Sequence, residues 1–120
     1  MEESKKNISG FKALRIANIA REKEWDPLKR ITLLYRGNEL AGEVGEACNV
    51  IKKLERERIE IRGTRINLID LADELADIII CADLVAMQEG IDMEEAVINK
   101  FNKTSEKYNI KTRMSNNGLY

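Results

Sequence analysis

Residues 71–88 have the sequence LADELADIIICADLVAMQ, and this stretch indicates the fold class of the chain. Residues 78–87 are apolar at nearly every position, so they lack the polar face of a surface helix. A helix of this kind has to be covered by other helices. Asn67 and Asp70 can cap its start, and we predict a central helix over about residues 67–88.

The spacing of apolar residues predicts three further helices, over about residues 11–25, 28–58 and 92–108. Pro27 separates the first two, because proline disfavours helical geometry in the residue before it, here Asp26. Asp92 and Glu95 form a D-x-x-E capping pattern before the last helix. We therefore expect one all-α domain over residues 1–120, a four-helix bundle with flexible tails at about residues 1–9 and 109–120.

The composition excludes several classes of function. Lys and Arg (20) nearly balance Asp and Glu (21), which argues against nucleic-acid binding or an anionic membrane surface, since both call for a basic excess. Histidine is absent, so Ser-His-Asp or Cys-His catalysis and His-based zinc sites are excluded. We expect Cys48 and Cys81 to be buried and reduced.

The N-terminus is polar and Asp83 interrupts the longest apolar stretch, so we expect a soluble cytoplasmic protein with no membrane partner. With 43% hydrophobic residues the chain can bury a core without a disulfide. The central helix is nevertheless too apolar for three neighbours to cover, and we expect a homodimer or homotetramer. Gly37, Gly42 and Gly45 interrupt the second helix, and either a closely approaching helix or room for a ligand would explain them.

Two pairs of carboxylates carry the chemical signal. Glu43 and Glu46 are three residues apart, as are Glu74 and Asp77, so each pair shares a helix face beside the apolar stripe. If the two helices are antiparallel, the pairs can meet and repel each other. Basic side chains could interleave, some carboxylates could be protonated, or a divalent cation could lie between them. Oxygen ligands alone favour Mg²⁺, with Mn²⁺ as the alternative.

Taken singly, each pair is also typical of a solvated helix face. Further acidic residues extend the two rows, and their roles are open: Glu39, Asp70 and Asp73.

A family resemblance rests on two stretches, LAGEVGEACNVIKKLER (residues 40–56) and LADELADIIICADLVAMQEGIDMEEAVINKFNKTSEKY (residues 71–108). The sequence resembles the MazG-type all-α nucleoside triphosphate pyrophosphohydrolases over about residues 11–108, and is most similar to the short dCTP-pyrophosphatase-like members. The resemblance implies a helical bundle completed by oligomerisation. It also implies Mg²⁺-dependent cleavage of nucleotides to the monophosphate and pyrophosphate, which would trim the dNTP pool.

By this resemblance four carboxylates would be the metal ligands: Glu43, Glu46, Glu74 and Asp77. Many members have two adjacent glutamates where this chain has Gly42 and Glu43; the dCTP-preferring type tolerates the glycine. It stays open whether Glu39 assists a second metal. Without a histidine or a nucleophile, the attacking group would be a metal-activated water, and Glu46 is our candidate for the general base.

Candidate substrate-binding residues complete the predicted site: Trp25, Lys53, Lys100, Asn102 and Tyr108. Lys53 lies two helical turns after Glu46 on the same face, whereas the family pattern supports Lys100. An aromatic residue near Trp25 stacks on the base in related enzymes, but Trp25 could equally cap the edge of the core. Asn102 and Tyr108 are candidate sugar or base contacts.

Two other functions compete with a dNTP pyrophosphohydrolase. One is a dUTP or phosphoribosyl-nucleotide phosphohydrolase of the same fold. The other is a non-catalytic helical interaction module, whose acidic rows would pair with Lys and Arg and whose stability would not depend on Mg²⁺.

Overall fold

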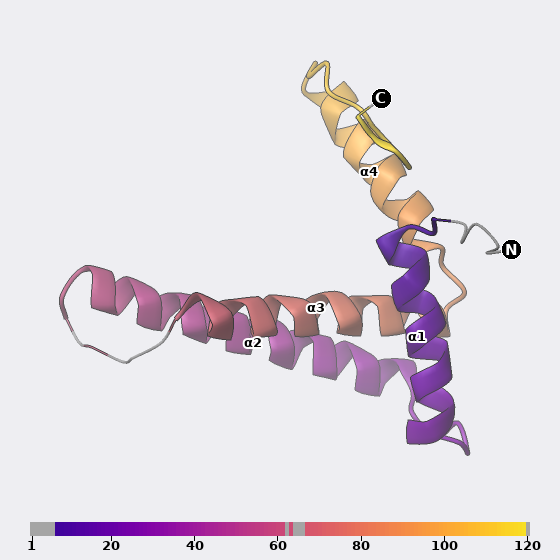
Figure 1. Cartoon of the computed structure of the whole chain (residues 1–120), viewed down its shortest axis with the longest axis horizontal. Coiled ribbons are helices and arrows are strands. Elements are labelled where there is room, and N and C mark those ends of the chain that lie inside the picture. The colour runs from indigo at the N-terminus through magenta and orange to yellow at the C-terminus, as the bar shows by residue number, and fades with distance from the viewer. Residues whose placement is uncertain (1–6, 62, 64–66, 120) are drawn as a thin grey trace, which may run out of the picture.

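The computed structural model describes residues 7–61, 63 and 67–119 (Figure 1). It confirms an all-α fold with four helices. Their bounds are Gly10–Trp25 (α1), Leu33–Arg58 (α2), Leu68–Gln88 (α3) and Met93–Lys107 (α4), followed by the short strands Met114–Ser115 (β1) and Gly118–Leu119 (β2).

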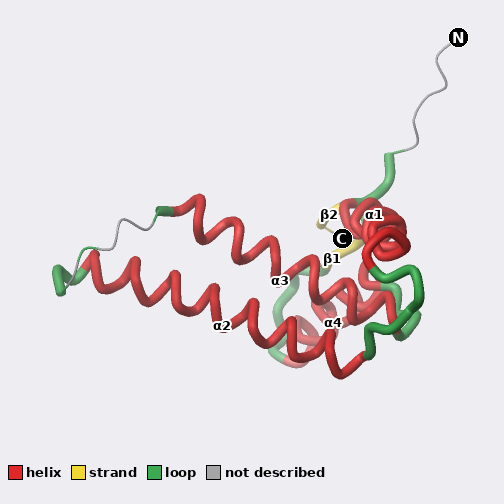
Figure 2. The backbone as a smooth tube through the Cα atoms, turned by 90° about the horizontal axis from the view of Figure 1, so that it is seen from below, coloured by secondary structure: helices red, strands yellow, loops and turns green. Residues whose placement is uncertain are grey.

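The two longest helices, α2 and α3, lie side by side and antiparallel, and form an arm that projects from the rest of the chain (Figures 1 and 2). Helix α1 crosses this arm at the end where α2 begins and α3 ends. Helix α4 contacts α1 and the β1–β2 hairpin and points away from the arm. Among the described residues, α2 and α3 are therefore the only two helices that pack lengthwise against each other.

Side chains cap the helices much as the sequence predicts. Asn67 and Asp70 form a complete capping box at the start of α3. Helix α2, however, begins at Leu33 rather than near residue 28. The Asp26 carboxylate accepts hydrogen bonds from the backbone N–H groups of Arg30 and Ile31, at 2.9 and 2.8 Å, and so holds the intervening segment in a loop. The break at Pro27 was predicted correctly, but its length was not.

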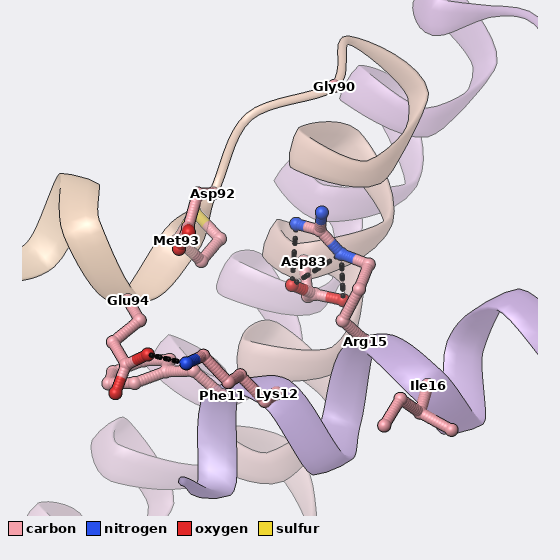
Figure 3. A pocket seen from close by; sticks show the side chains of 9 residues that line it. All are labelled: Phe11, Lys12, Arg15, Ile16, Asp83, Gly90, Asp92, Met93 and Glu94. Atoms are coloured by element: carbon pink, nitrogen blue, oxygen red, sulfur yellow. Dashed lines mark hydrogen bonds and ion pairs between the residues drawn. The ribbon is translucent and has the colours of Figure 1, made fainter. Parts of the chain in front are cut away.

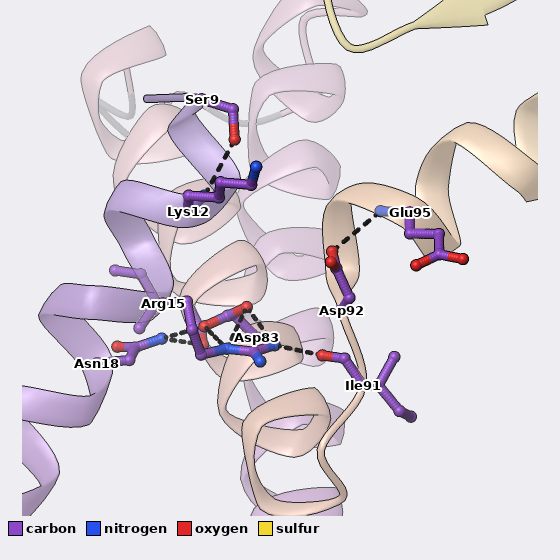
Figure 4. A network of polar contacts seen from close by, with 9 residues as sticks. Ser9, Lys12, Arg15, Asn18, Asp83, Ile91, Asp92 and Glu95 are labelled. Atoms are coloured by element: carbon purple, nitrogen blue, oxygen red, sulfur yellow. Dashed lines mark hydrogen bonds and ion pairs between the residues drawn. The ribbon is translucent and has the colours of Figure 1, made fainter. Parts of the chain in front are cut away.

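A buried polar network holds α1 against α3 (Figure 4). The Asp83 carboxylate accepts hydrogen bonds from the Arg15 guanidinium at 3.0–3.2 Å and from the Asn18 amide at 2.9 Å. Arg15 also donates to the backbone oxygen of Ile91, in the loop before α4, at 2.8 Å. This one carboxylate therefore orients three parts of the chain.

The C-terminal segment, expected to be a flexible tail, contains a two-stranded hairpin packed on α4. Met114 pairs with Leu119 and Ser115 with Gly118. The Asn102 side chain accepts a hydrogen bond from the backbone N–H of Met114 at 2.7 Å and donates one to its oxygen at 2.9 Å. Asn102 thus anchors the hairpin to the helix.

The core of a single chain is small. Among the described residues, the buried apolar side chains are Ala47, Val50, Cys81 and Ala86. The radius of gyration is 18.1 Å, whereas a compact domain of this length would have about 14 Å. The outer face of α3 stays exposed in a single chain, as expected for a helix too apolar for three neighbours to cover.

Several smaller expectations can be compared with the structure. Both cysteines are free, and Cys81 is buried as expected, but Cys48 is exposed and that part of the prediction is wrong. A methyl group added at Gly37, Gly42 or Gly45 would have no described atom within 4 Å beyond the adjacent helix backbone, so no other helix of the same chain approaches closely there. No helix among the described residues has both the length and the apolar character needed to cross a lipid bilayer.

Candidate functional site

Three of the four predicted metal ligands converge between the two helices of the arm. Glu43 and Glu46 extend from α2 and Glu74 extends from α3, and one carboxylate oxygen from each lies within 4.8 Å of the others. In the described part of the chain, no other group of acidic, cysteine or histidine side chains meets this criterion. The spacing of three residues within a helix and the antiparallel pairing together produce this cluster.

Two carboxylate oxygens of the cluster have no hydrogen-bond partner in the described part of the chain. Glu43 Oε2 and Glu74 Oε2 are buried and have no hydrogen-bond partner among the described residues. Burial raises the pKa of Glu43 above its usual value, and Glu46 and Asp77 raise it further by charge repulsion. Burial also raises the pKa of Glu74, and the negative charges of Glu46 and Asp77 raise it further. The fold thus holds these two carboxyl groups where their ionised form is disfavoured.

A divalent cation fits this arrangement. Basic side chains do not interleave, because none of the ion pairs in the described part of the chain involves these carboxylates. A buried carboxylate oxygen without a donor is costly unless a proton or a cation satisfies it. Because all the donors are carboxylate oxygens, the set suits Mg²⁺ or Mn²⁺ better than zinc.

A cavity of about 380 Å³ adjoins the carboxylates. Glu43 and Asp77 line it on one side, so Asp77 lies next to the cluster although it is outside the group of three. Its wall also includes Trp25, a residue at the end of α1 that is 76% exposed, and Tyr35, in the first turn of α2. The arrangement places two aromatic side chains and an acidic cluster around one open space.

A family comparison supports the same chemistry. The family profile described as the MazG nucleotide pyrophosphohydrolase domain matches residues 32–110. The chain belongs to this family. The matched MazG domain runs from the cap of α2 past the end of α4 and includes both acidic pairs, but it leaves out α1. No curated protein and no solved structure matches the chain.

The remaining predicted site residues of the MazG domain lie elsewhere. Lys53 is half-buried, about two turns along α2 from Glu46. Lys100, Asn102 and Tyr108 belong to α4 or its end, and none of them lines the cavity beside the carboxylates. The amide nitrogen and oxygen of Asn102 both form hydrogen bonds with the backbone of Met114, so this side chain has a structural role. A single chain does not bring the α4 residues to the site.

The structure also assigns roles to acidic residues that the sequence left open. Asp70 caps α3, accepting a hydrogen bond from the Asn67 backbone N–H at 3.0 Å. Asp73 is exposed and contributes to the raised pKa of Glu74. Glu39 lines the cavity and accepts a hydrogen bond from the Cys81 thiol at 3.5 Å. Tyr35 was not among the predicted site residues, and Cys81 was expected only as a buried, reduced residue. Tyr35 lies one turn before Glu39, and Cys81 lies one turn after Asp77.

A second cavity, of about 390 Å³, lies where α1 faces the start of α4 (Figure 3). Its charged side chains are engaged in holding the fold. Lys12 pairs with Glu94 at 3.4 Å, and Arg15 pairs with Asp83. Asp92 caps α4 through the backbone N–H of Glu95. This cavity therefore offers fewer free groups for a ligand than the one beside the carboxylates.

Proposed function

We propose that the protein hydrolyses (deoxy)nucleoside triphosphates to the monophosphate and pyrophosphate, with Mg²⁺ held by Glu43, Glu46, Glu74 and Asp77. The observation that carries the proposal is the pair of buried carboxylate oxygens without partners inside a cluster of three. Family membership supports the reaction class, and the oxygen-only ligand set supports the choice of metal.

A bound Mg²⁺ would lower the pKa of a water and offset the charge of the phosphate oxygens. The reaction joins the oxygen of a water to the α-phosphorus and breaks the bond from that phosphorus to the bridging oxygen, so that pyrophosphate leaves. The proton of the water goes to a carboxylate. Glu46 suits this role, because it is exposed while Glu43 and Glu74 are half-buried, and a water therefore has room beside it.

The cavity next to the cluster suits the base and sugar of the nucleotide. Trp25 would stack on the base, an interaction worth about 1–3 kcal/mol per base in other proteins. Lys53 would meet the phosphates from α2. We propose a substrate of the dCTP type within the dNTP pool. Cleavage of dUTP or of a phosphoribosyl nucleotide is the alternative within this fold.

A homodimer would complete the fold. A row of apolar side chains on the outer face of α3 is exposed at helical spacing: Leu68 (73%), Leu75 (45%) and Ile79 (58%). Val44 and Ile51, at 42% and 49%, are exposed on α2. A second copy packing its own arm on these faces would supply the missing core, and it would also bring in an α4 that carries Lys100 and Tyr108.

The experiment is a panel of nucleotides incubated with Mg²⁺ and assayed for pyrophosphate and orthophosphate. We expect pyrophosphate release that depends on Mg²⁺ and is lost in Glu46→Gln, with the helical content unchanged. Glu57→Gln, an exposed position near the far end of α2, is the matched control and should behave as the wild type. Orthophosphate as the primary product would contradict the proposed bond cleavage.

Hydrolysis unaffected by Mg²⁺ would contradict the proposed metal site. A non-catalytic interaction module remains the competing function. It would require the acidic rows to pair with Lys and Arg, and the described carboxylates of the cluster form no such pairs. Complete absence of hydrolysis, together with stability that does not respond to Mg²⁺, would favour that module.

A further inference from the structure

Glu39 occupies a distinctive position in the cavity beside the carboxylates. It is on α2, one turn before Glu43, so about 6 Å of helix axis separates the two residues. It is half-buried and lines the same space as Trp25 and Tyr35. Glu39 is nevertheless outside the group of three carboxylates that converge on the candidate metal position.

The local contacts hold one oxygen of Glu39 and leave the other available. The buried Cys81 thiol donates to Oε1 at 3.5 Å, and no other described donor contacts this carboxylate. The nearby Arg36 does not neutralise it, because the Arg36 guanidinium is bonded to Glu22 and Gln88. Glu39 therefore presents a hydrogen-bond acceptor to the cavity.

We propose that Glu39 determines base specificity by accepting a hydrogen bond from an exocyclic amino group of the base. This inference rests on the proposed function, which places the phosphates near the acidic cluster and stacks the base on Trp25. An ionised carboxylate can only accept hydrogen bonds. It pairs with the N4 amino group of cytosine or the N6 amino group of adenine.

The same carboxylate disfavours bases that carry an oxygen at this position. Uracil and hypoxanthine would present a carbonyl oxygen to Glu39, and two acceptors facing each other in a partly buried site gain no hydrogen bond and lose their water. A site built to hydrogen-bond an amino group strongly rejects an analogue that lacks this donor, because the polar group of the site is then left unpaired. The preference therefore comes from both attraction and repulsion.

The test compares nucleotides that differ at this one group: dCTP with dUTP, and dATP with dITP. We consider the pair that the wild type cleaves faster. In that pair, we expect the kcat/KM of the wild type to be about 10- to 100-fold higher for the nucleotide whose base carries the amino group. Glu39→Gln presents a donor as well as an acceptor, and should reduce that preference to within about threefold. The Mg²⁺ concentration needed for half-maximal rate should stay unchanged, and Glu57→Gln should keep the preference.

Two results would overturn the proposal. One is an equal loss of activity on both members of a pair in Glu39→Gln with a higher Mg²⁺ requirement, which would make Glu39 a metal ligand. The other is an unchanged preference in the variant. If the wild type cleaves no nucleotide, the proposed function fails, but base specificity can still be measured as binding. Quenching of the fluorescence of Trp25, the sole tryptophan, should show that the wild type binds dCMP more tightly than dUMP. Glu39→Gln should not show this difference.

Discussion

The ion pair between Arg15 and Asp83 gives the most quantitative prediction about stability. Only 4% of the Asp83 side chain and 21% of the Arg15 side chain are exposed, so the two charges compensate each other away from water. Asp83→Asn keeps the shape and removes one charge. Because the remaining guanidinium is then largely buried without a counter-charge, the cost should be about 3 kcal/mol, the lower end of the range for a broken buried pair.

This loss should be visible in thermal unfolding followed by circular dichroism. For a chain of this length, about 3 kcal/mol corresponds to a Tm decrease of roughly 12 °C. The control is Glu94→Gln, which breaks the pair with Lys12. The Glu94 side chain is only 12% exposed, but Lys12 is 59% exposed and keeps its water when the pair is broken, so the change should cost at most about 1 kcal/mol. An equal Tm decrease in the two variants would refute the argument from burial.

A double-mutant cycle tests the cause more strictly. Adding Arg15→Met to Asp83→Asn removes the uncompensated charge, so the double variant should recover at least about 1 kcal/mol relative to Asp83→Asn alone. Additive losses would mean that the two side chains act independently, contrary to the network that holds α1 on α3.

Three other outcomes follow from the structure. The pKa values of Glu43 and Glu74 are raised in the folded protein, so protonation of these groups stabilises the fold fully below about pH 4.5, and this stabilisation is lost as the pH rises through their raised values. Denaturant titrations of the metal-free protein between about pH 4.5 and 7 should show the loss as a falling free energy of unfolding. Glu43→Gln should make that fall smaller. Burial raises the pKa of Cys81 to about 12, so iodoacetamide at pH 8 should label the exposed Cys48 and spare Cys81, as peptide mass mapping would reveal. Asn102→Ala removes both hydrogen bonds to the hairpin and should cost about 1 to 2 kcal/mol in urea unfolding, while proteolysis that spares the C-terminal segment of this variant would contradict the anchoring role.

The features that local patterns control were predictable from the sequence. The capping box of Asn67 and Asp70 is a four-residue signal, and it formed as expected. The spacing of Glu43, Glu46 and Glu74 required only helical geometry and an antiparallel hairpin to bring them together. The capping box depends on neighbours within one turn, and the carboxylate cluster needs only the spacing within each helix and the antiparallel pairing of α2 and α3.

The features that follow no periodic pattern in the sequence were not predictable. Residues 28–32 have apolar spacing compatible with a helix, but the Asp26 side chain bonds their backbone and delays α2. The hairpin depends on Asn102, twelve residues before Met114, and no periodic pattern marks it. Cys48 looked like a core residue because its neighbours are apolar, yet it lies on a face that a single chain leaves exposed.

In the proposed metal site, the fold holds the carboxylates of α2 and α3 together at an energetic cost that a divalent cation would relieve. The most direct test of this proposal is the melting temperature of wild type and Glu74→Gln, each with and without Mg²⁺. We predict that Mg²⁺ at about 100 times its Kd raises the Tm of the wild type by roughly 10 °C. Glu74→Gln should melt at or above the metal-free wild type and respond little to Mg²⁺. A wild-type Tm that ignores Mg²⁺, combined with a lower Tm in Glu74→Gln, would contradict the account.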